Sequence, residues 1–343
     1  MNPIRHQTPQ APAKSPKEGT GSVLAVDIGG TTIKGGIFTS TSQQILHRTR
    51  PTFESGHTPL ENLLHLLHLL RREANNLGLE PQTVGIGTPG FVDSSRGIIR
   101  YAANLGWHDI NLRALLQEAV ALPVVIDHDA RAAARAELNI RPHLQDLIVI
   151  PIGTGVAAAI ITQGRIVSGY EGAAGEFGHT ISVPDGEPCP CGQKGCLETY
   201  ASASAILRRY RAAGGTQAHH TSEIPTLLNT DRVAAHVWAD AIAALATGIS
   251  NLTAVLDPQE VVISGGLARA GNNLLHPLRT AITQRLQWRR TPTISLSNMA
   301  SRAGLQGAAL MALDQATPPH NQSTRAPNRT QLTNERRRPT ITR

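Results

Sequence analysis

The same local pattern, an apolar strand, a Gly/Thr turn and a second strand, occurs in both halves of the chain. It reads DIGGTTIKGGIF at residues 27–38 and PIGTGVAAAII at residues 151–161. The spacing of the apolar runs predicts antiparallel pairing around each turn. Because internal repetition is typical of duplicated supersecondary units, we expect two related α/β domains that face a shared cleft.

Apolar periodicity in the rest of the chain predicts alternating helices and strands. Amphipathic or alanine-rich segments indicate helices at residues 59–79, 112–121, 130–138, 233–256 and 304–313. Apolar runs indicate further strands at residues 83–87, 123–126 and 260–264. The hairpin signal Gln163-Gly164 favours a strand over residues 156–162, where a helix was the alternative. A length of 343 residues suits two domains of ordinary size.

The formal net charge of +7 belongs to the two ends of the chain. Residues 1–20 carry a net +2 and residues 317–343 a net +5, so the region between them is formally neutral. Both ends are rich in Pro, Thr, Gln and Asn, so we predict disordered tails over residues 1–21 and 316–343. The Arg336–Arg338 run is more typical of a solvated tail than of a contact with nucleic acid or other polyanions.

The composition is that of a globular protein, with 40% hydrophobic and 17% charged residues. No uninterrupted apolar run approaches the roughly 20 residues of a membrane span, and the N-terminal segment lacks an apolar signal core. Three cysteines cannot all pair as disulfides. We therefore expect a cytoplasmic protein with reduced cysteines that contacts no membrane.

All three cysteines lie within one short segment, HTISVPDGEPCPCGQKGCLE, at residues 179–198. Together with one histidine they make a complete ligand set for tetrahedral zinc. The alternative is a group of reduced structural thiols beside a surface histidine, but the spacing and the interleaved Gly192 and Gly195 favour the metal. The ligands that this pattern predicts are His179, Cys189, Cys191 and Cys196. A small-residue loop, GAAGEFGH, carries the carboxylate of Glu176 into the segment.

Three glycine turns each follow a predicted strand, at residues 29–32, 153–155 and 265–266. Any one of them alone is an ordinary turn, but the exposed N–H groups of such turns suit phosphate oxygens. All three together, with Asp27 at a strand end, predict a nucleotide cleft between two lobes. A P-loop motif is absent from the sequence. GIGTPG at residues 85–90 formally matches a dinucleotide fingerprint, but Pro89 and the FVDSSRG that follows predict a turn and a hairpin.

Asp129 stands where an apolar strand gives way to a helix. It could cap that helix, or it could act in the cleft as a general base that accepts a proton from a substrate hydroxyl. The residues alone leave both interpretations open. Asp127 shares its face if both residues are extended, whereas Asp109 is interpreted as structural.

These segments resemble the ROK family of repressors, open reading frames and sugar kinases, from about Val23 to Leu313. The motifs that carry the resemblance are CPCGQKGCLE, DIGGTTIKGG, GIGTPGFVD, NLGW, GTGVAAAI, GAAGEFGH and ISGGLA. The resemblance implies an actin-like, hexokinase-type fold of two α/β lobes. We expect the first lobe at residues 22–130, the second at residues 131–300 with the zinc loop, and a helix at residues 301–315 that returns to the first lobe.

The resemblance also implies a role for each site residue. ATP would lie between the lobes, with Asp27 placing Mg²⁺ and the glycine pair near the adenosine. Asp129 would be the catalytic base, and His179 would serve both the zinc and the sugar through its two nitrogens. The implied ATP and phosphate contacts are Asp27, Gly29, Gly30, Thr31, Thr32, Lys34, Gly153, Thr154, Gly155, Gly265 and Gly266. The implied sugar contacts are Asn104, His128, Asp129, Glu176, His179 and Glu198.

The chain departs from the family pattern beside the predicted base. The usual Asn–Asp pair is His128-Asp129 here, and the next Asn of the pattern is Arg131. Because that first Asn normally touches sugar hydroxyls, the exchange for a bulkier histidine bears on which sugar is used. We expect Arg131 to point to solvent or to a neighbouring carboxylate.

The leading hypothesis is an ATP-dependent kinase that acts on the 6-hydroxyl of glucose, with ATP, Mg²⁺ and a structural Zn²⁺ as cofactors. An N-acetylglucosamine or N-acetylmannosamine kinase is the alternative within the class, and polyphosphate is the alternative donor. A sugar-responsive repressor is the alternative outside it, but only about twenty residues precede Val23, too few for a helix-turn-helix domain. The family resemblance implies a homodimer or a dimer of dimers, and nucleic acid is not expected as a partner.

Overall fold

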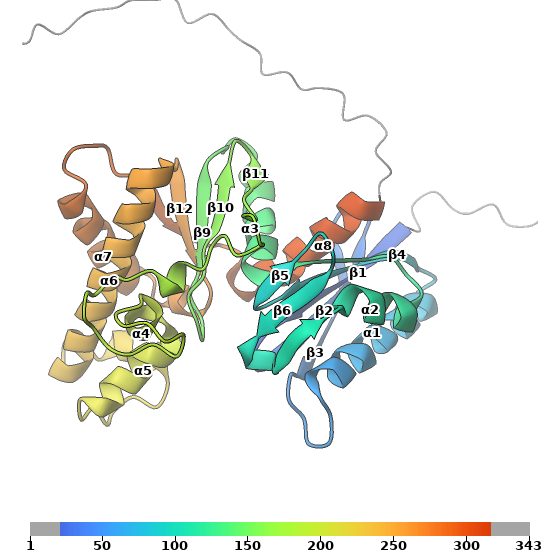
Figure 1. Ribbon diagram of the computed structural model, residues 1–343, viewed down its shortest axis with the longest axis horizontal. Helices are drawn as coiled ribbons and strands as arrows, with labels where there is room; N and C mark the ends of the chain where they lie inside the picture. The colour runs from blue at the N-terminus through green and yellow to red at the C-terminus, as the bar shows by residue number, and fades with distance from the viewer. Residues whose placement is uncertain (1–20, 317–343) are drawn as a thin grey trace, which may run out of the picture.

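The computed structural model describes residues 21–316, which form two lobes, each built on a five-stranded sheet (Figure 1). The first sheet has the order β3-β2-β1-β4-β8 and the second the order β11-β10-β9-β12-β13. The strands of the first sheet are β1 (Gly21–Ile28), β2 (Thr32–Thr39), β3 (Gln44–Pro51), β4 (Glu80–Thr88) and β8 (Val124–His128). Those of the second are β9 (Leu147–Pro151), β10 (Ala159–Thr162), β11 (Arg165–Ile166), β12 (Glu260–Ser264) and β13 (Thr293–Leu296).

The two sheets share one topology. In each, the first strand pairs antiparallel with the next strand along the chain and parallel with a strand that follows much later, and a further parallel strand lies beyond it. This equivalence confirms the duplicated α/β organisation that the repeated strand–turn–strand pattern predicts. The hairpin after β10 is also confirmed, but β10 begins at Ala159, later than predicted, because Val156 makes only an isolated bridge with Ile152.

Both faces of β1 are buried, and alternate residues pack against different layers of helices. Leu24 and Val26 pack under the helices α1 (Pro59–Asn76) and α2 (Leu112–Val120), whereas Val23 and Ala25 face α8 (Ala303–Ala316). The two-residue period of a strand produces this division. The start of α1 is fixed by a capping box between Thr58 and Glu61, which satisfies two otherwise unpaired backbone donors.

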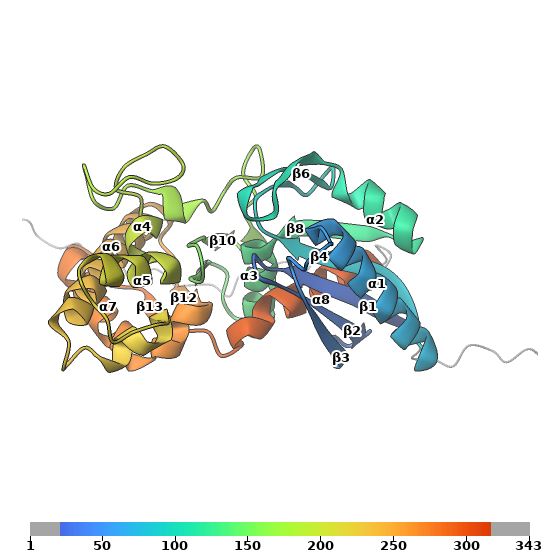
Figure 2. The same ribbon diagram turned by 90° about the horizontal axis from the view of Figure 1, so that it is seen from below.

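Two alanine-rich helices, α8 and α3 (Asp129–Asn139), lie against each other between the sheets (Figure 2). Their backbones approach so closely that a Cβ at Gly307 would lie 1.7 Å from the carbonyl oxygen of Ala132. A Cβ at Gly85 of β4 would likewise lie 1.9 Å from the oxygen of Ala308. α3 also packs on β9 and β10, so the predicted lobe boundary after residue 130 falls within a helix that touches both lobes. That boundary stays a prediction.

The second lobe is covered mainly by α6 (Arg232–Leu256) and α7 (Asn272–Arg285), with α4 (Glu198–Ala201) and α5 (Ala203–Ala212) beside them. Among residues 21–316, α6 alone has the length and apolar character of a membrane span, and half of its apolar window is buried within the protein. Its buried side chains, such as Trp238 and Leu245, belong to the core of this lobe. α6 therefore packs as a core helix.

A small antiparallel sheet completes the first lobe, formed by β5 (Phe91–Asp93), β6 (Ile98–Ala102) and β7 (Trp107–Ile110). Its first hairpin confirms that GIGTPG leads into a turn and a strand. Short 3₁₀ helices lie at η1 (Ala103–Leu105), η2 (Phe177–His179), η3 (Thr221–Thr226), η4 (Gly266–Ala270) and η5 (Ala300–Arg302). Gly21 and Ala316 belong to β1 and α8, so the predicted tails are one residue too long at each end; the remainder of both lies outside the described residues.

Candidate active site in the interlobe cleft

A cleft of about 290 Å³ lies where elements of both sheets meet α3 and the start of α8. It brings together five of the residues that the sequence singles out: Asp27, Lys34, Asp129, Gly265 and Gly266. Pro151 and Ser264 end two parallel strands at the cleft, which places it at the carboxyl ends of the second sheet. In open α/β sheets this edge is where ligands bind.

Asp27 is the penultimate residue of β1 and lies on the wall of the cleft, close to the first glycine turn. Its carboxylate lies 3.2 Å from the Nζ of Lys34, the residue opposite it in β2. The approach of α8 is close, because a Cβ at Gly304 would lie 2.7 Å from the carboxyl carbon of Asp27. Burial raises the pKa of the Asp27 carboxyl, while Lys34 opposes that rise and the charge of Asp129 adds to it.

The raised pKa of Asp27 predicts a pH-dependent gain in stability for the Asp27→Asn variant. When a carboxyl has a higher pKa in the folded than in the unfolded state, its ionisation disfavours folding. The cost is absent below the unfolded pKa of about 3.9 and is complete above the raised folded pKa. In the absence of nucleotide, thermal unfolding should therefore show a higher Tm for the variant at neutral pH, and this difference should vanish below about pH 3.9. An equal difference at both pH values would contradict the assignment.

Asp129 is the first residue of α3, and its side chain is 37% exposed. The helix cap is His128, whose Nδ1 accepts a hydrogen bond from the Ala130 N–H at 3.1 Å. One Asp129 oxygen also accepts from that N–H, at 2.6 Å. Asp129 lies close to Asp27, since a Cβ at Gly87 would be within 3.8 Å of atoms of both residues. The sequence left the cap and base roles of Asp129 open; the structure assigns the capping position to its neighbour.

Two of the three glycine turns are closed by a local backbone hydrogen bond. Gly29 N–H donates to the Thr32 carbonyl at 3.0 Å, and Gly30 lies beside Asn104, whose Cβ would be 3.9 Å from a Cβ at that glycine. Gly153 N–H donates to Gly155 at 2.9 Å. Gly265 has φ +81°, and a Cβ there would lie 2.4 Å from a backbone oxygen, so this position requires glycine.

Glu198 connects the second glycine turn to the metal-loop region. Its Oε2 accepts a hydrogen bond from the Val156 N–H at 2.7 Å, and a Cβ at Gly155 would lie 2.6 Å from the same oxygen. The backbone of Gly178, two residues after Glu176, is also close to this carboxylate. Glu198 is thus placed between the turn predicted for phosphate and the loop predicted for sugar.

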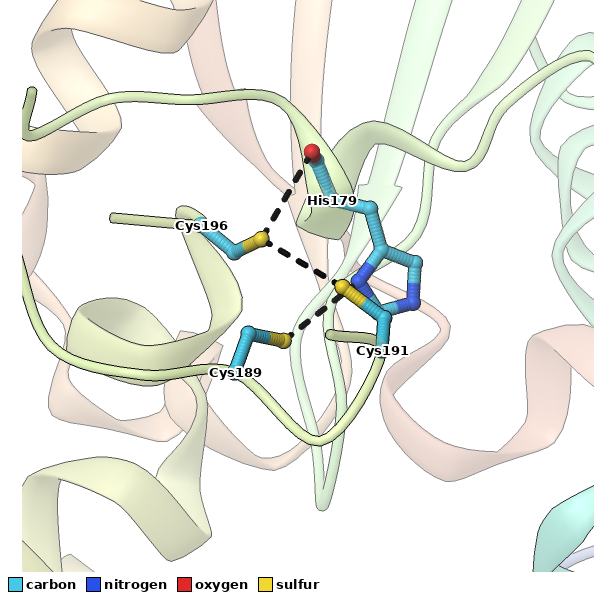
Figure 3. Close-up of side chains that lie close together, drawn as sticks. All are labelled: His179, Cys189, Cys191 and Cys196. Atoms are coloured by element: carbon cyan, nitrogen blue, oxygen red, sulfur yellow. Dashed lines mark hydrogen bonds between the residues drawn. The ribbon is translucent and has the colours of Figure 1, made fainter. Parts of the chain in front are cut away.

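His179 and the three cysteines converge on one point (Figure 3), with their ligand atoms all within 4.8 Å of one another. The Sγ atoms of Cys191 and Cys196 are 3.7 Å apart, and Cys189 Sγ is 3.8 Å from His179 Nδ1. A tetrahedron with zinc–sulfur bonds of about 2.3 Å has edges of about 3.8 Å, so these two separations match those that zinc requires. Burial raises the pKa of the Cys196 thiol to about 12, and a bound cation would favour its thiolate.

Other residues around the cleft were not foreseen from the sequence. Arg269 and Ser301 line it, and the Ser301 carbonyl accepts a hydrogen bond from Lys34 at 3.3 Å. Arg269 lies three residues after Gly266, so a cation this close to the glycine pair was the available signal. Arg131 pairs with Asp127 and is buried; of the two expectations for it, the neighbouring carboxylate is confirmed and solvent is wrong.

Two lobes with duplicated sheets, and between them a cleft lined by a glycine pair and two carboxylates, define the actin-like, hexokinase-type fold. A solved glucokinase from Streptomyces griseus, in complex with glucose and AMPPNP, superposes with a TM-score of 0.74 at 29% identity, over 85% of this chain and 99% of that one. Residues 23–315 match the ROK family, and the chain belongs to that family.

Relatives of the chain include sugar kinases of two specificities. A glucokinase from Halalkalibacterium halodurans is 34% identical over 277 residues, which cover 75% of this chain and 83% of that protein. An N-acetyl-D-glucosamine kinase from Yersinia enterocolitica is 32% identical over 302 residues, which cover 84% and 98%. The family expected from the sequence is confirmed.

Proposed function

We propose that the protein is an ATP-dependent sugar kinase that phosphorylates the 6-hydroxyl of glucose. The observation that carries the proposal is the partly exposed carboxylate of Asp129, in one cleft with Asp27, Lys34 and the pair Gly265-Gly266. A carboxylate free to accept a proton, beside a carboxylate and a cation suited to a metal–phosphate group, is what phosphoryl transfer to a hydroxyl needs. The activities of the relatives support the same class.

In the proposed reaction the oxygen of the sugar hydroxyl attacks the terminal phosphorus of ATP, while Asp129 accepts the proton of that hydroxyl. The bond from that phosphorus to the ADP oxygen breaks, which gives a sugar 6-phosphate and ADP. Asp27 would hold Mg²⁺, which when bound neutralises phosphate charge, and Lys34 would contact phosphate oxygens. The turns at residues 29–32 and 153–155 would donate backbone N–H groups to the phosphates.

We propose that the polar side chains around the metal loop and the start of α3 form hydrogen bonds with the sugar hydroxyls. A structural Zn²⁺ bound by His179 and the three cysteines would fix the loop, and four protein ligands leave it no open position for catalysis. With Nδ1 of His179 directed at the cysteines, Nε2 remains available for a hydroxyl. The proposed sugar contacts are Asn104, His128, Asp129, Glu176, His179 and Glu198. We also retain the cytoplasmic location and the homodimer or dimer of dimers as proposals.

A panel of sugars in an assay coupled to ADP formation tests the proposal. We expect kcat/KM for glucose to exceed that for N-acetylglucosamine and N-acetylmannosamine by about tenfold, with ATP preferred over polyphosphate. If no hexose is phosphorylated, the proposed function is wrong. If an N-acetylated sugar is preferred, the alternative supported by the Yersinia relative replaces glucose.

The exchange of the usual Asn for His128 gives that alternative a specific test. In the His128→Asn variant the helix cap is retained, because Asn is a favoured N-cap residue. The smaller amide leaves more room, so we expect the kcat/KM of N-acetylated sugars relative to glucose to rise about tenfold. The same panel measures it, with ATP KM as the internal control. An unchanged ratio would mean that His128 only caps α3.

A further inference from the structure

Arg131 is an arginine buried to 2% exposure, and every hydrogen bond that its guanidinium makes serves the surroundings of the proposed sugar site. Its Nε donates to Asp127 Oδ1 at 2.7 Å. Its Nη1 donates to the carbonyl of Gly172 at 2.8 Å, and its Nη2 lies 3.4 Å from both the Val92 carbonyl and Ser94 Oγ. One side chain thus ties α3 to β8, to the β5 hairpin and to the loop that leads to Glu176.

The loop from Gly172 to Glu176 is held at both ends. Gly172 has φ +81°, and a Cβ there would lie 2.4 Å from the Val92 carbonyl oxygen, so the loop backbone presses on β5 of the first lobe. At the other end the Gly175 carbonyl accepts from the Ala158 N–H at 2.8 Å, in the second lobe. Glu176 follows directly and leads into the helical turn that carries His179. Without the anchor at Gly172, the loop would be held only at its Gly175 end, directly before Glu176.

Asp127 fixes the guanidinium in place. Its Oδ1 also accepts from Ser94 Oγ at 2.6 Å and from the His128 N–H at 2.7 Å, and its side chain is only 16% exposed. Among residues 21–316, Arg131 is the cation within ion-pair distance of this carboxylate. An Asn at position 131 would be neutral and shorter, so it could not replace this charge and still span to Gly172.

We propose that Arg131, held by Asp127, is a positioning residue for sugar binding: it clamps the Gly172 carbonyl and thereby sets the loop that presents Glu176. The inference rests on the proposed kinase function. Arg131 touches no reacting atom. Its loss should therefore weaken the binding of the sugar and leave the transfer step and the nucleotide site intact.

The test compares Arg131→Asn, Arg131→Lys and the matched control Arg135→Asn. Arg135 lies one turn further along α3 and pairs with the exposed Asp314 on α8. We expect Arg131→Asn to raise glucose KM about tenfold, with kcat and ATP KM within about threefold of wild type, and the control to change none of them. Arg131→Lys keeps the ion pair but lacks the fork that spans to Gly172, so it should retain the wild-type Tm while glucose KM stays raised.

Hydrogen–deuterium exchange of residues 168–176 supplies a readout that does not depend on activity. Faster exchange of this segment in both Arg131 variants, with α8 unchanged, is the expected result. If the wild type phosphorylates no sugar but both variants show this faster exchange, the proposed function is wrong and the positioning role of Arg131 in the loop is still supported. Unchanged exchange, or a glucose KM that returns to wild type in Arg131→Lys, would overturn the inference and leave a structural ion pair only.

Discussion

Replacement of Asp129 by Asn is expected to lower kcat for sugar phosphorylation by about 10³-fold, within the range that positioned general bases contribute. The amide is isosteric with the carboxylate but cannot take the hydroxyl proton at neutral pH. The affinities for glucose and ATP should change by less than about threefold, because binding groups elsewhere in the cleft are untouched. Steady-state kinetics and isothermal titration with each ligand measure the two effects separately.

The position of Asp129 at the start of α3 makes a structural control necessary. Because an acidic residue in the first helical turn stabilises the helix dipole, the variant should lose a little stability, and thermal unfolding must show that it is folded at the assay temperature. Asp314→Asn, an exposed aspartate on α8 paired with Arg135, is the matched variant and should keep wild-type kinetics. Retention of wild-type kcat by Asp129→Asn would refute the assignment of the base.

Elements with strong apolar runs or faces were predictable, whereas elements defined by their neighbours were not. Four interior strands of the two sheets are largely buried, so each has an apolar run that marks it as a strand; these are β1, β4, β9 and β12. β3 is an edge strand with alternating exposure and arginines, and no apolar run marks it. α7 contains Pro277, which propensity alone would exclude from a helix, and its burial depends on contacts with α6.

The site shows the same division between local and long-range information. The four proposed zinc ligands are at most seventeen residues apart in the sequence. Their convergence could therefore be predicted from local spacing. The hydrogen bond from Val156 to Glu198 joins residues 42 apart, and that from Arg131 to Gly172 joins residues 41 apart. No periodicity or motif reports such pairs, because they arise only from tertiary packing, the first within the second lobe and the second between α3 and the loop before Glu176.

Loss of the metal from the cysteine–histidine cluster is the second large effect that we expect. In Cys191→Ser the weakened ligand set should release the proposed zinc, which elemental analysis would detect as a fall from about one ion per chain. Glucose KM should then rise at least tenfold, since the loop between Glu176 and Glu198 loses its brace, a change of about 1.4 kcal/mol or more in binding. kcat at saturating glucose should fall only about threefold, because a closed tetrahedral site offers no Lewis acid to the substrate.

Cys191 is the suitable ligand to change because it is exposed, so its replacement perturbs packing less than that of the buried Cys189 or Cys196. Lys194→Ala, an exposed non-ligand in the same loop, is the matched control and should keep both its zinc and its glucose KM. Chelation of the wild type gives an independent route to the same state, with circular dichroism to verify the fold. Two results would contradict the bracing role: a folded, zinc-free protein with normal glucose KM, or a collapse of kcat with KM unchanged, which would mean that the ion takes part in the chemistry.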